Sequence, residues 1–214
     1  MLTELSKIDL ICLLQQQVGN LFTITTAEKD VVAEILNDVL VRTEYCFSKS
    51  ANKYYSKNGE TYFSPFHSGQ YAIYLYFFSN EIHRRYGAKF RNLADKIYYL
   101  NKTLNSLDLF YEVEMPKAFF LDHPLGSVIG RATYGEGFSF TQGCTVGNNN
   151  GEYPVFGENV AMLSNSKVIG RCAVGSHVVF AANSYAKDID VPSHSIVFGQ
   201  SPNHIIKPAM GRPI

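Results

Sequence analysis

The sequence has no tryptophan, few charged residues and no excess of either charge. Charged residues make up 18% of the chain, and its 19 lysines and arginines balance its 19 aspartates and glutamates. A nucleic-acid-binding protein usually carries a basic excess or a basic stripe, so this balance argues against that class. Because apolar residues reach 46%, we expect a globular chain and not a disordered one.

Long apolar runs and metal-binding cysteine patterns are also missing. The N-terminal apolar run covers only 10–14, whereas a secretory signal needs about 7–15 apolar residues and a membrane helix about 20. The four cysteines form no CxxC pair and have no histidine at zinc-finger spacing. We therefore expect a cytoplasmic protein without a membrane span, in which Cys12, Cys46, Cys144 and Cys172 are reduced and buried.

The first half of the chain shows the three-to-four spacing of amphipathic helices. The expected elements are helices at 2–14, 25–40, 70–85 and 89–107 and a polar loop at 48–64. Thr25 and Glu28 fit a capping box at the start of the second helix. We interpret 1–107 as an N-terminal α-helical domain.

From residue 108 a six-residue period replaces the helical spacing. Its apolar anchors form two series, which are Val128, Tyr134, Phe140 and Val146, then Phe156, Met162, Val168, Val174, Phe180 and Ala186. Such a repeat predicts a parallel β-helix with three flat faces, in which each hexapeptide adds one strand and one corner and its anchor points inward. A β-sandwich, the alternative, would alternate at a period of two with turns about every 8–12 residues.

The fold class is therefore mainly β, with a parallel β-helix and C-terminal tail over 108–214 after the helical domain. The two series of anchors are separated by ten residues instead of six, because a polar loop at 147–154 interrupts them. Loops on solenoids often carry binding residues, although a harmless insertion explains the same spacing equally well.

Asp122 and His123 lie just before the first regular repeat. A histidine can act as a general base near neutral pH when a carboxylate holds its second ring nitrogen. Asp108 precedes His123 by 15 residues, so a β-helix that begins this early would stack it roughly beneath His123. A zinc site of three histidines is disfavoured, since His123 and His177 are out of register once the four extra loop residues are removed.

A resemblance to the serine acetyltransferase branch of the hexapeptide-repeat acyltransferases is carried by FFLDHPLGSVIGRATYGEGFSFTQGCTVG, residues 119–147. That family shows a similar Leu-Asp-His-x-x-Gly-x-Val-Val-Gly run and then Gln-x-Val-Thr-Leu-Gly. The closing segment VPSHSIVFGQSP at 191–202 and the pair Phe66-His67 before an aromatic helix extend the resemblance. It implies a left-handed β-helix, a homotrimer, and two trimers joined through the helical domain.

The resemblance also implies an acetyl-CoA-dependent O-acetyltransferase without a metal. It places the general base on His123, the carboxylate partner of that base on Asp108, and an acceptor-binding carboxylate on Asp122. The base takes a proton from the acceptor hydroxyl, whose oxygen attacks the thioester directly without an acetyl-enzyme. The cofactor-lining positions that it implies are Gly147, Ser164 and Ala182.

Two departures from the family concern the acceptor. Where the family reads the amino-acid carboxylate with Arg-His-Pro, this chain has Glu152, Tyr153 and Pro154, and a glutamate would repel a carboxylate. No acid stands near Ala51 and Asn52, where the family has a second acceptor aspartate. We therefore predict a neutral hydroxyl, on a sugar or a surface-polysaccharide precursor, bound with the help of Glu152 and Tyr153. The alternatives are a serine O-acetyltransferase of cysteine biosynthesis, a non-catalytic β-helix scaffold, and transfer to an amine.

Overall fold

The computed structural model describes residues 1–209. Contacts divide the chain into two units, Met1–Asn105 and Ser106–Ile214, whereas the sequence placed the boundary between 107 and 108. The last helix ends at Asn105, and the next residue takes a left-handed φ of 50°. Among the described residues, every helix is too short or too polar to span a bilayer.

The first unit, which we call the helical unit, contains four α-helices, two short 3-10 turns and three short strands. They are β1 (Leu2–Thr3), α1 (Lys7–Leu21), α2 (Thr26–Ser48), η1 (Lys53–Tyr55), β2 (Ser56–Lys57), β3 (Glu60–Phe63), α3 (Ser68–Tyr86), η2 (Gly87–Phe90) and α4 (Arg91–Asn105). Helix α3 contacts both α2 and α4 and is buried over most of its length. The Tyr74 ring lies 4.8 Å from the Phe63 ring and 5.2 Å from the Phe78 ring, so aromatic packing fills this core.

Polar side chains begin three of these helices. Ser6 accepts a hydrogen bond from the Asp9 N–H at the start of α1. Thr25 and Glu28 form the capping box of α2, as the sequence predicted. His67 accepts the Gln70 N–H through Nδ1 at the start of α3. Each cap satisfies a backbone donor that a helix leaves unpaired at its first turn.

Two expectations for the helical unit are wrong. The helix predicted over 2–14 begins only at Lys7, because Leu2–Thr3 pairs in parallel with β3. The polar loop at 48–64 contains the antiparallel hairpin of β2 and β3. Its two turn residues, Asn58 and Gly59, have φ of 55° and 81°, as a two-residue hairpin turn requires.

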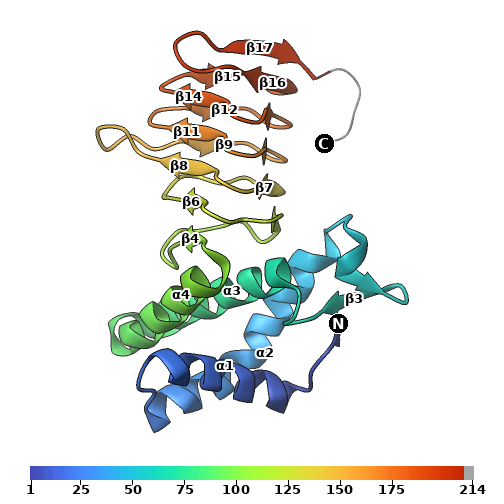
Figure 1. The fold of residues 1–214 in the computed structure, drawn as a ribbon, viewed down its shortest axis with the longest axis vertical. Coiled ribbons are helices and arrows are strands. Elements are labelled where there is room, and N and C mark those ends of the chain that lie inside the picture. The colour runs from blue at the N-terminus through green and yellow to red at the C-terminus, as the bar shows by residue number, and fades with distance from the viewer. Residues whose placement is uncertain (210–214) are drawn as a thin grey trace. The chain divides into compact units, whose positions relative to one another are not determined.

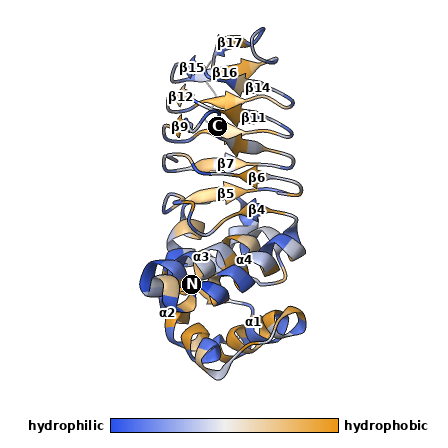
Figure 2. Ribbon diagram, turned by 90° about the vertical axis from the view of Figure 1, so that its left-hand side faces the viewer, coloured by the Kyte–Doolittle hydropathy of each residue, from blue (hydrophilic) through white to orange (hydrophobic). Residues whose placement is uncertain are grey.

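The second unit is a parallel β-solenoid of about five turns, which confirms the predicted fold class (Figure 1). Its strands form three stacked faces. Face 1 consists of β5 (Phe119–Leu121), β7 (Phe138–Phe140), β10 (Ala161–Met162), β13 (Val179–Phe180), β16 (Ser195–Phe198) and antiparallel β17 (Ile205–Pro208). Face 2 consists of β4 (Asp108–Leu109), β6 (Val128–Ile129), β8 (Thr145–Gly147), β11 (Lys167–Ile169) and β14 (Tyr185–Lys187). Face 3 consists of β9 (Val155–Phe156), β12 (Ala173–Val174) and β15 (Asp190–Val191). In Figure 2 the strands of this unit carry most of its apolar colour.

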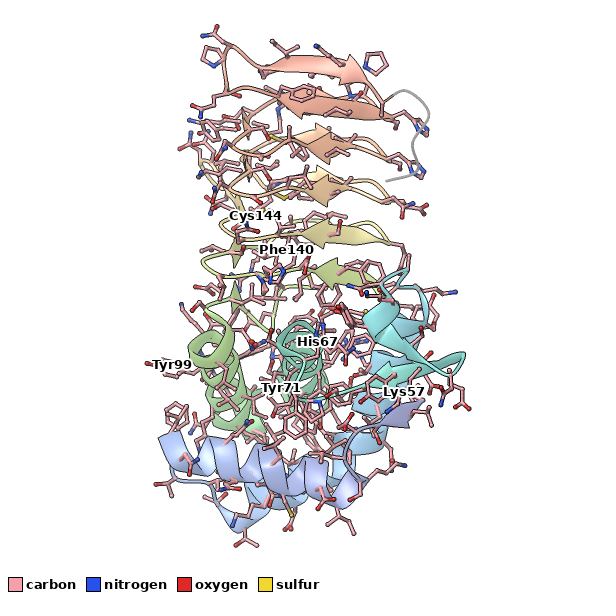
Figure 3. The ribbon with its side chains drawn as sticks, turned by 45° about the vertical axis from the view of Figure 1, so that its right-hand side comes forward. Lys57, His67, Tyr71, Tyr99, Phe140 and Cys144 are labelled. Atoms are coloured by element: carbon pink, nitrogen blue, oxygen red, sulfur yellow. The ribbon has the colours of Figure 1, made fainter. Side chains whose placement is uncertain are left out.

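The predicted anchors line the bore of the solenoid with one exception. Val128 is 45% exposed, and Ile129 is buried in its place beside Val146, while the other anchors are buried. Eight positions separate Leu121 from Ile129, but six separate Phe140 from Val146 on the next coil. The two extra residues lie in the corner that carries His123. The shift from Val128 to Ile129 arises on the other side of β6, because five positions, not six, separate Ile129 from the next inward residue, Tyr134. Figure 3 labels Phe140 within the stack of coils.

Three of the four cysteines are buried, as expected, and all four are free thiols. Cys12 is exposed, so the expectation of burial is wrong there. Helix α1 buries Leu10, Leu14 and Val18, which share one face, and Cys12 lies away from that face. Burial raises the pKa of the Cys172 thiol.

Candidate functional site

Two edges of the solenoid carry the candidate residues. The first edge joins face 1 to face 2 and consists of the corners 122–127, 141–144, 163–166 and 181–184. The second edge joins face 2 to face 3 and consists of 130–132, 148–154, 170–172 and 188–189. Corners at one edge stack upon each other because successive coils are paired in parallel.

Asp122 and His123 project from the first edge into solvent. Their side chains are 71% and 83% exposed, and the imidazole Nε2 lies 3.5 Å from the Asp122 Oδ1. The Asp122 N–H donates to the Phe140 carbonyl at 3.1 Å, which ties this corner to the coil above. His123 has a left-handed φ of 47°, and Leu125 N–H donates to its carbonyl at 2.8 Å. An exposed imidazole in a fixed turn is open to an incoming hydroxyl group.

Asp108 lies on face 2, at the beginning of β4. Strand pairing aligns it with Val128, and its N–H donates to the Ser127 carbonyl at 2.9 Å. The expected stacking beneath His123 assumed a coil of 18 residues, but this first coil has 20 because its corner is longer. Asp108 therefore lies one coil below Ser127, at the end of the corner. Asp122 and His123 stand at the beginning of the same corner.

Two of the three positions expected to line the cofactor share the first edge with His123. The Ser164 carbonyl accepts the Asn183 N–H at 2.9 Å, so the corner with Ala182 stacks directly on the corner with Ser164. Ser164 Oγ also lies 3.4 Å from the Thr141 hydroxyl. This arrangement gives the first edge a line of small side chains above the Asp–His pair.

The remaining candidates lie on or beside the second edge. Gly147 ends β8 and pairs with Ile169 on the next coil. Glu152 and Tyr153 follow in the polar loop, where both are exposed. Within one chain, the structure thus separates these three residues from His123, which lies on the first edge.

The sequence reasoning missed a polar contact beneath the loop. Asn149 Nδ2 donates to Asp188 Oδ2 at 2.7 Å across 39 residues. The one available signal was that polar residues recur at the same corner of successive coils. Within residues 1–209, no group of three or more His, Cys, Asp or Glu side chains is placed to hold a metal ion.

Known proteins resemble this chain in sequence and in fold. A curated serine acetyltransferase of Staphylococcus aureus is 30% identical over 146 residues, which is 66% of this chain and 66% of that protein. A solved serine acetyltransferase of Brucella abortus has a TM-score of 0.66 at 19% identity, covering 86% of this chain and 77% of that one. A second Brucella abortus structure, in complex with coenzyme A, has a TM-score of 0.63 at 17% identity, covering 86% and 76%. No model of a protein family matches the chain.

The chain belongs to the serine acetyltransferase-like branch of the hexapeptide-repeat acyltransferases. It spans 66% of the length of the curated relatives that it matches. These relatives support the predicted enzyme class, an acyltransferase that uses acetyl-CoA. The predicted carbohydrate acceptor finds no support among these relatives, which are named for serine.

Proposed function

We propose that this protein transfers the acetyl group of acetyl-CoA to the hydroxyl of L-serine, with His123 as the general base. The observation that carries the proposal is the alignment with the staphylococcal serine acetyltransferase. The open position of the Asp122–His123 pair on the first edge supports it, because a base must reach the proton that it removes.

In the proposed reaction, the His123 imidazole accepts the proton of the serine hydroxyl while the hydroxyl oxygen attacks the thioester carbonyl carbon. A C–O bond forms, the C–S bond breaks, and the departing CoA sulfur takes the proton from the imidazolium. The products are O-acetylserine and CoA with a free thiol, and no acetyl-enzyme forms. Asp108 orients the imidazole, and Asp122 binds the acceptor.

We propose that the CoA chain follows the first edge. Ser164 and Ala182 lie there one coil apart, and their small side chains allow a ligand to approach the backbone closely. Thr141, whose hydroxyl lies 3.4 Å from that of Ser164, adds a polar group to the same line. Since acetyl-CoA supplies the acetyl group, we expect the reaction in the cytoplasm.

A homotrimer would complete this site. One chain has His123 on its first edge, whereas Gly147, Glu152 and Tyr153 lie on or beside its second edge. Around a threefold axis, the first edge of one copy would face the second edge of its neighbour. The joining of two trimers through the helical unit remains an expectation from the family resemblance.

One observation favours a neutral sugar hydroxyl as a second candidate acceptor. Glu152 is exposed in the loop, and its carboxylate forms no ion pair with another residue of the part of the chain that the structure describes. An unpaired carboxylate repels the carboxylate of free serine. The relatives favour serine, and Glu152 with Tyr153 favours the sugar.

CoA release, followed with a free-thiol reagent, tests the proposal. Acetyl-CoA is mixed with L-serine or with a panel of sugars and sugar nucleotides, and His123→Asn is compared with the wild type. Asparagine keeps the left-handed turn, as Asn165 and Asn183 do in neighbouring corners. We expect His123→Asn to lower kcat about 10²- to 10⁴-fold, the usual contribution of a general base.

The matched control is His177→Asn, which changes a histidine of the same left-handed conformation at another corner. We expect it to keep wild-type activity. Serine-dependent release that depends on His123 supports the proposal, and sugar-dependent release supports the second candidate. Absence of release with every acceptor would favour a non-catalytic scaffold.

A further inference from the structure

The polar loop contains a short hairpin at 149–152, which we call the loop hairpin and which leads into Tyr153. We infer that Asp188 is a positioning residue for the acceptor, because its carboxylate fixes this hairpin and with it Glu152 and Tyr153. The inference rests on the proposed function, since the hairpin reads an acceptor only if the chain transfers acetyl groups. It goes further by naming a pair of residues, Asn149 and Asp188, that neither the family resemblance nor the mechanism uses.

The hairpin is regular in itself. The Asn149 N–H donates to the Glu152 carbonyl and the Glu152 N–H donates to the Asn149 carbonyl, both at 3.0 Å. Asn150 and Gly151 have φ of 52° and 83°, as a two-residue hairpin turn requires. Paired strands β8 and β11 are 22 residues apart instead of 18, so the hairpin is the extra length of this coil. Its direction relative to the solenoid therefore depends on contacts at its base.

A single carboxylate supplies the main contact at that base. Asp188 Oδ2 accepts a hydrogen bond from Asn149 Nδ2 at 2.7 Å. Asp188 Oδ1 accepts the Arg171 N–H at 2.9 Å. Both oxygens of Asp188 are thus engaged, one by the hairpin and one by the backbone of the corner above the hairpin.

The corner between these two residues is shaped to let them meet. Gly170 N–H donates to the Gly147 carbonyl at 2.9 Å, just before the hairpin begins. A Cβ at Gly170 would collide with Asp188 Oδ1 and with the Asn149 side chain. The two side chains therefore close over the bare Cα of Gly170, and this close approach is a second observation that singles out the same pair.

Fixing the hairpin matters because binding is sensitive to small displacements. A misplacement of about 1 Å in a positioning group can cost about 100-fold in rate. Asp188 holds Asn149, which is three residues before Glu152 and is paired with it through the backbone. Loss of the carboxylate would free the hairpin to pivot, and Glu152 and Tyr153 would move with it.

Exchanging the two side chains tests the inference. Asn149→Asp places two carboxylates against each other, and Asp188→Asn removes the charge while keeping an acceptor for Arg171. The double variant Asn149→Asp/Asp188→Asn restores the hydrogen bond with donor and acceptor exchanged. We expect the acceptor KM of Asn149→Asp to rise about tenfold at saturating acetyl-CoA, within the range of coupling between bonded residues. The double variant should return it to within about twofold of the wild type.

The control is Asp190→Asn, since Asp190 lies on β15 and contacts the Arg171 guanidinium at 3.2 Å. We expect it to leave the acceptor KM unchanged. The melting temperature and kcat of all four variants should stay near the wild-type values, because a merely structural defect would lower these instead. An unchanged acceptor KM in Asn149→Asp, or no rescue in the double variant, overturns the inference.

Amide hydrogen exchange separates this inference from the proposed function. Faster exchange at the Asn149 and Glu152 amides in Asn149→Asp, reversed in the double variant, shows that Asp188 fixes the hairpin even if no acceptor is acetylated. In that case the proposed function fails while the contact stands. If the wild type transfers acetyl groups but exchange at these amides is unchanged in Asn149→Asp, the role of the contact is overturned and the proposed function stands.

Discussion

The helical unit and the solenoid bury their apolar side chains in different ways. In the helical unit, contacts cross long stretches of chain, as when the Tyr71 hydroxyl donates to Gln17 across 54 residues. In the solenoid, each inward residue lies beside its counterparts one coil above and below, as Phe140 lies between Leu121 and Met162. The core of the solenoid is therefore a series of short-range contacts, and that of the helical unit is one shared cluster.

The largest effect is expected from Phe140→Ala, since this side chain is 1% exposed on β7, between β5 and β10 of face 1. The cavity should cost about 3–5 kcal/mol of unfolding free energy, measured by urea unfolding. Because contacts in a solenoid are local, hydrogen exchange should rise first in β5, β7 and β10. The outward neighbour Ser139→Ala should change stability by less than about 0.5 kcal/mol. An equal loss of protection in α3 would contradict the separation of the two units.

The next effect compares two adjacent residues of β6. Ile129→Thr should lower the unfolding free energy by about 2–4 kcal/mol, because it removes apolar contacts and buries a hydroxyl in the bore. Val128→Thr should change it by less than about 0.5 kcal/mol, since Val128 is 45% exposed. Urea unfolding of the two variants decides which residue points inward. The reverse order would mean that the six-residue period holds through the first coil after all.

The repeat made the solenoid the more predictable region. A period of six fixes which side chains point inward, and it located Phe156 through Ala186 correctly. It misplaced Val128 because the inward residues Ile129 and Tyr134 are five positions apart, one fewer than the period of six. The helical unit has no such repeat, so the start of α1 and the hairpin of β2 and β3 depended on tertiary pairing. The Asn58-Gly59 turn was nevertheless a local signal for that hairpin.

The positions of the candidate residues were predictable where these residues are adjacent in sequence, and their roles stay predictions. Asp122 and His123 are adjacent, and their turn is exposed, as a reacting pair requires. The place of Asp108 was harder to predict, because coil length varies from one coil to the next. The contact of Asn149 with Asp188 joins corners 39 residues apart, and no spacing rule selects one polar pair among several at the same edge.

The helical unit contains a partly buried ion pair, whereas the buried polar side chains of the solenoid within residues 1–209 are uncharged. Lys96 Nζ on α4 donates to Glu28 Oε1 at 2.6 Å and to the Thr23 carbonyl at 2.8 Å. Burial alone would raise the pKa of the Glu28 carboxyl, but hydrogen bonds from Lys96 and Thr25 outweigh it, and the pKa lies below its ordinary value of 4.5. Because the folded state binds the proton less tightly, this contact stabilises the unit above pH 4.5 and weakens as the pH falls through the lowered value.

The smallest effect is expected from Lys96→Met, which removes the charge and keeps the apolar stem. At pH 7 it should lower the unfolding free energy by about 1.5 kcal/mol, the lower end for a hydrogen bond to a charged group. The difference from the wild type should shrink at pH 3, because the contact weakens as the pH falls from 4.5 toward the lowered pKa of Glu28. Lys29→Met removes an exposed charge beside Glu28 and should have the unfolding free energy of the wild type at both pH values. Urea unfolding at pH 7 and pH 3 measures how far the unfolding free energy of each variant differs from that of the wild type. If the difference for Lys96→Met has the same size at both pH values, packing of the lysine stem, and not its charge, joins α4 to the start of α2.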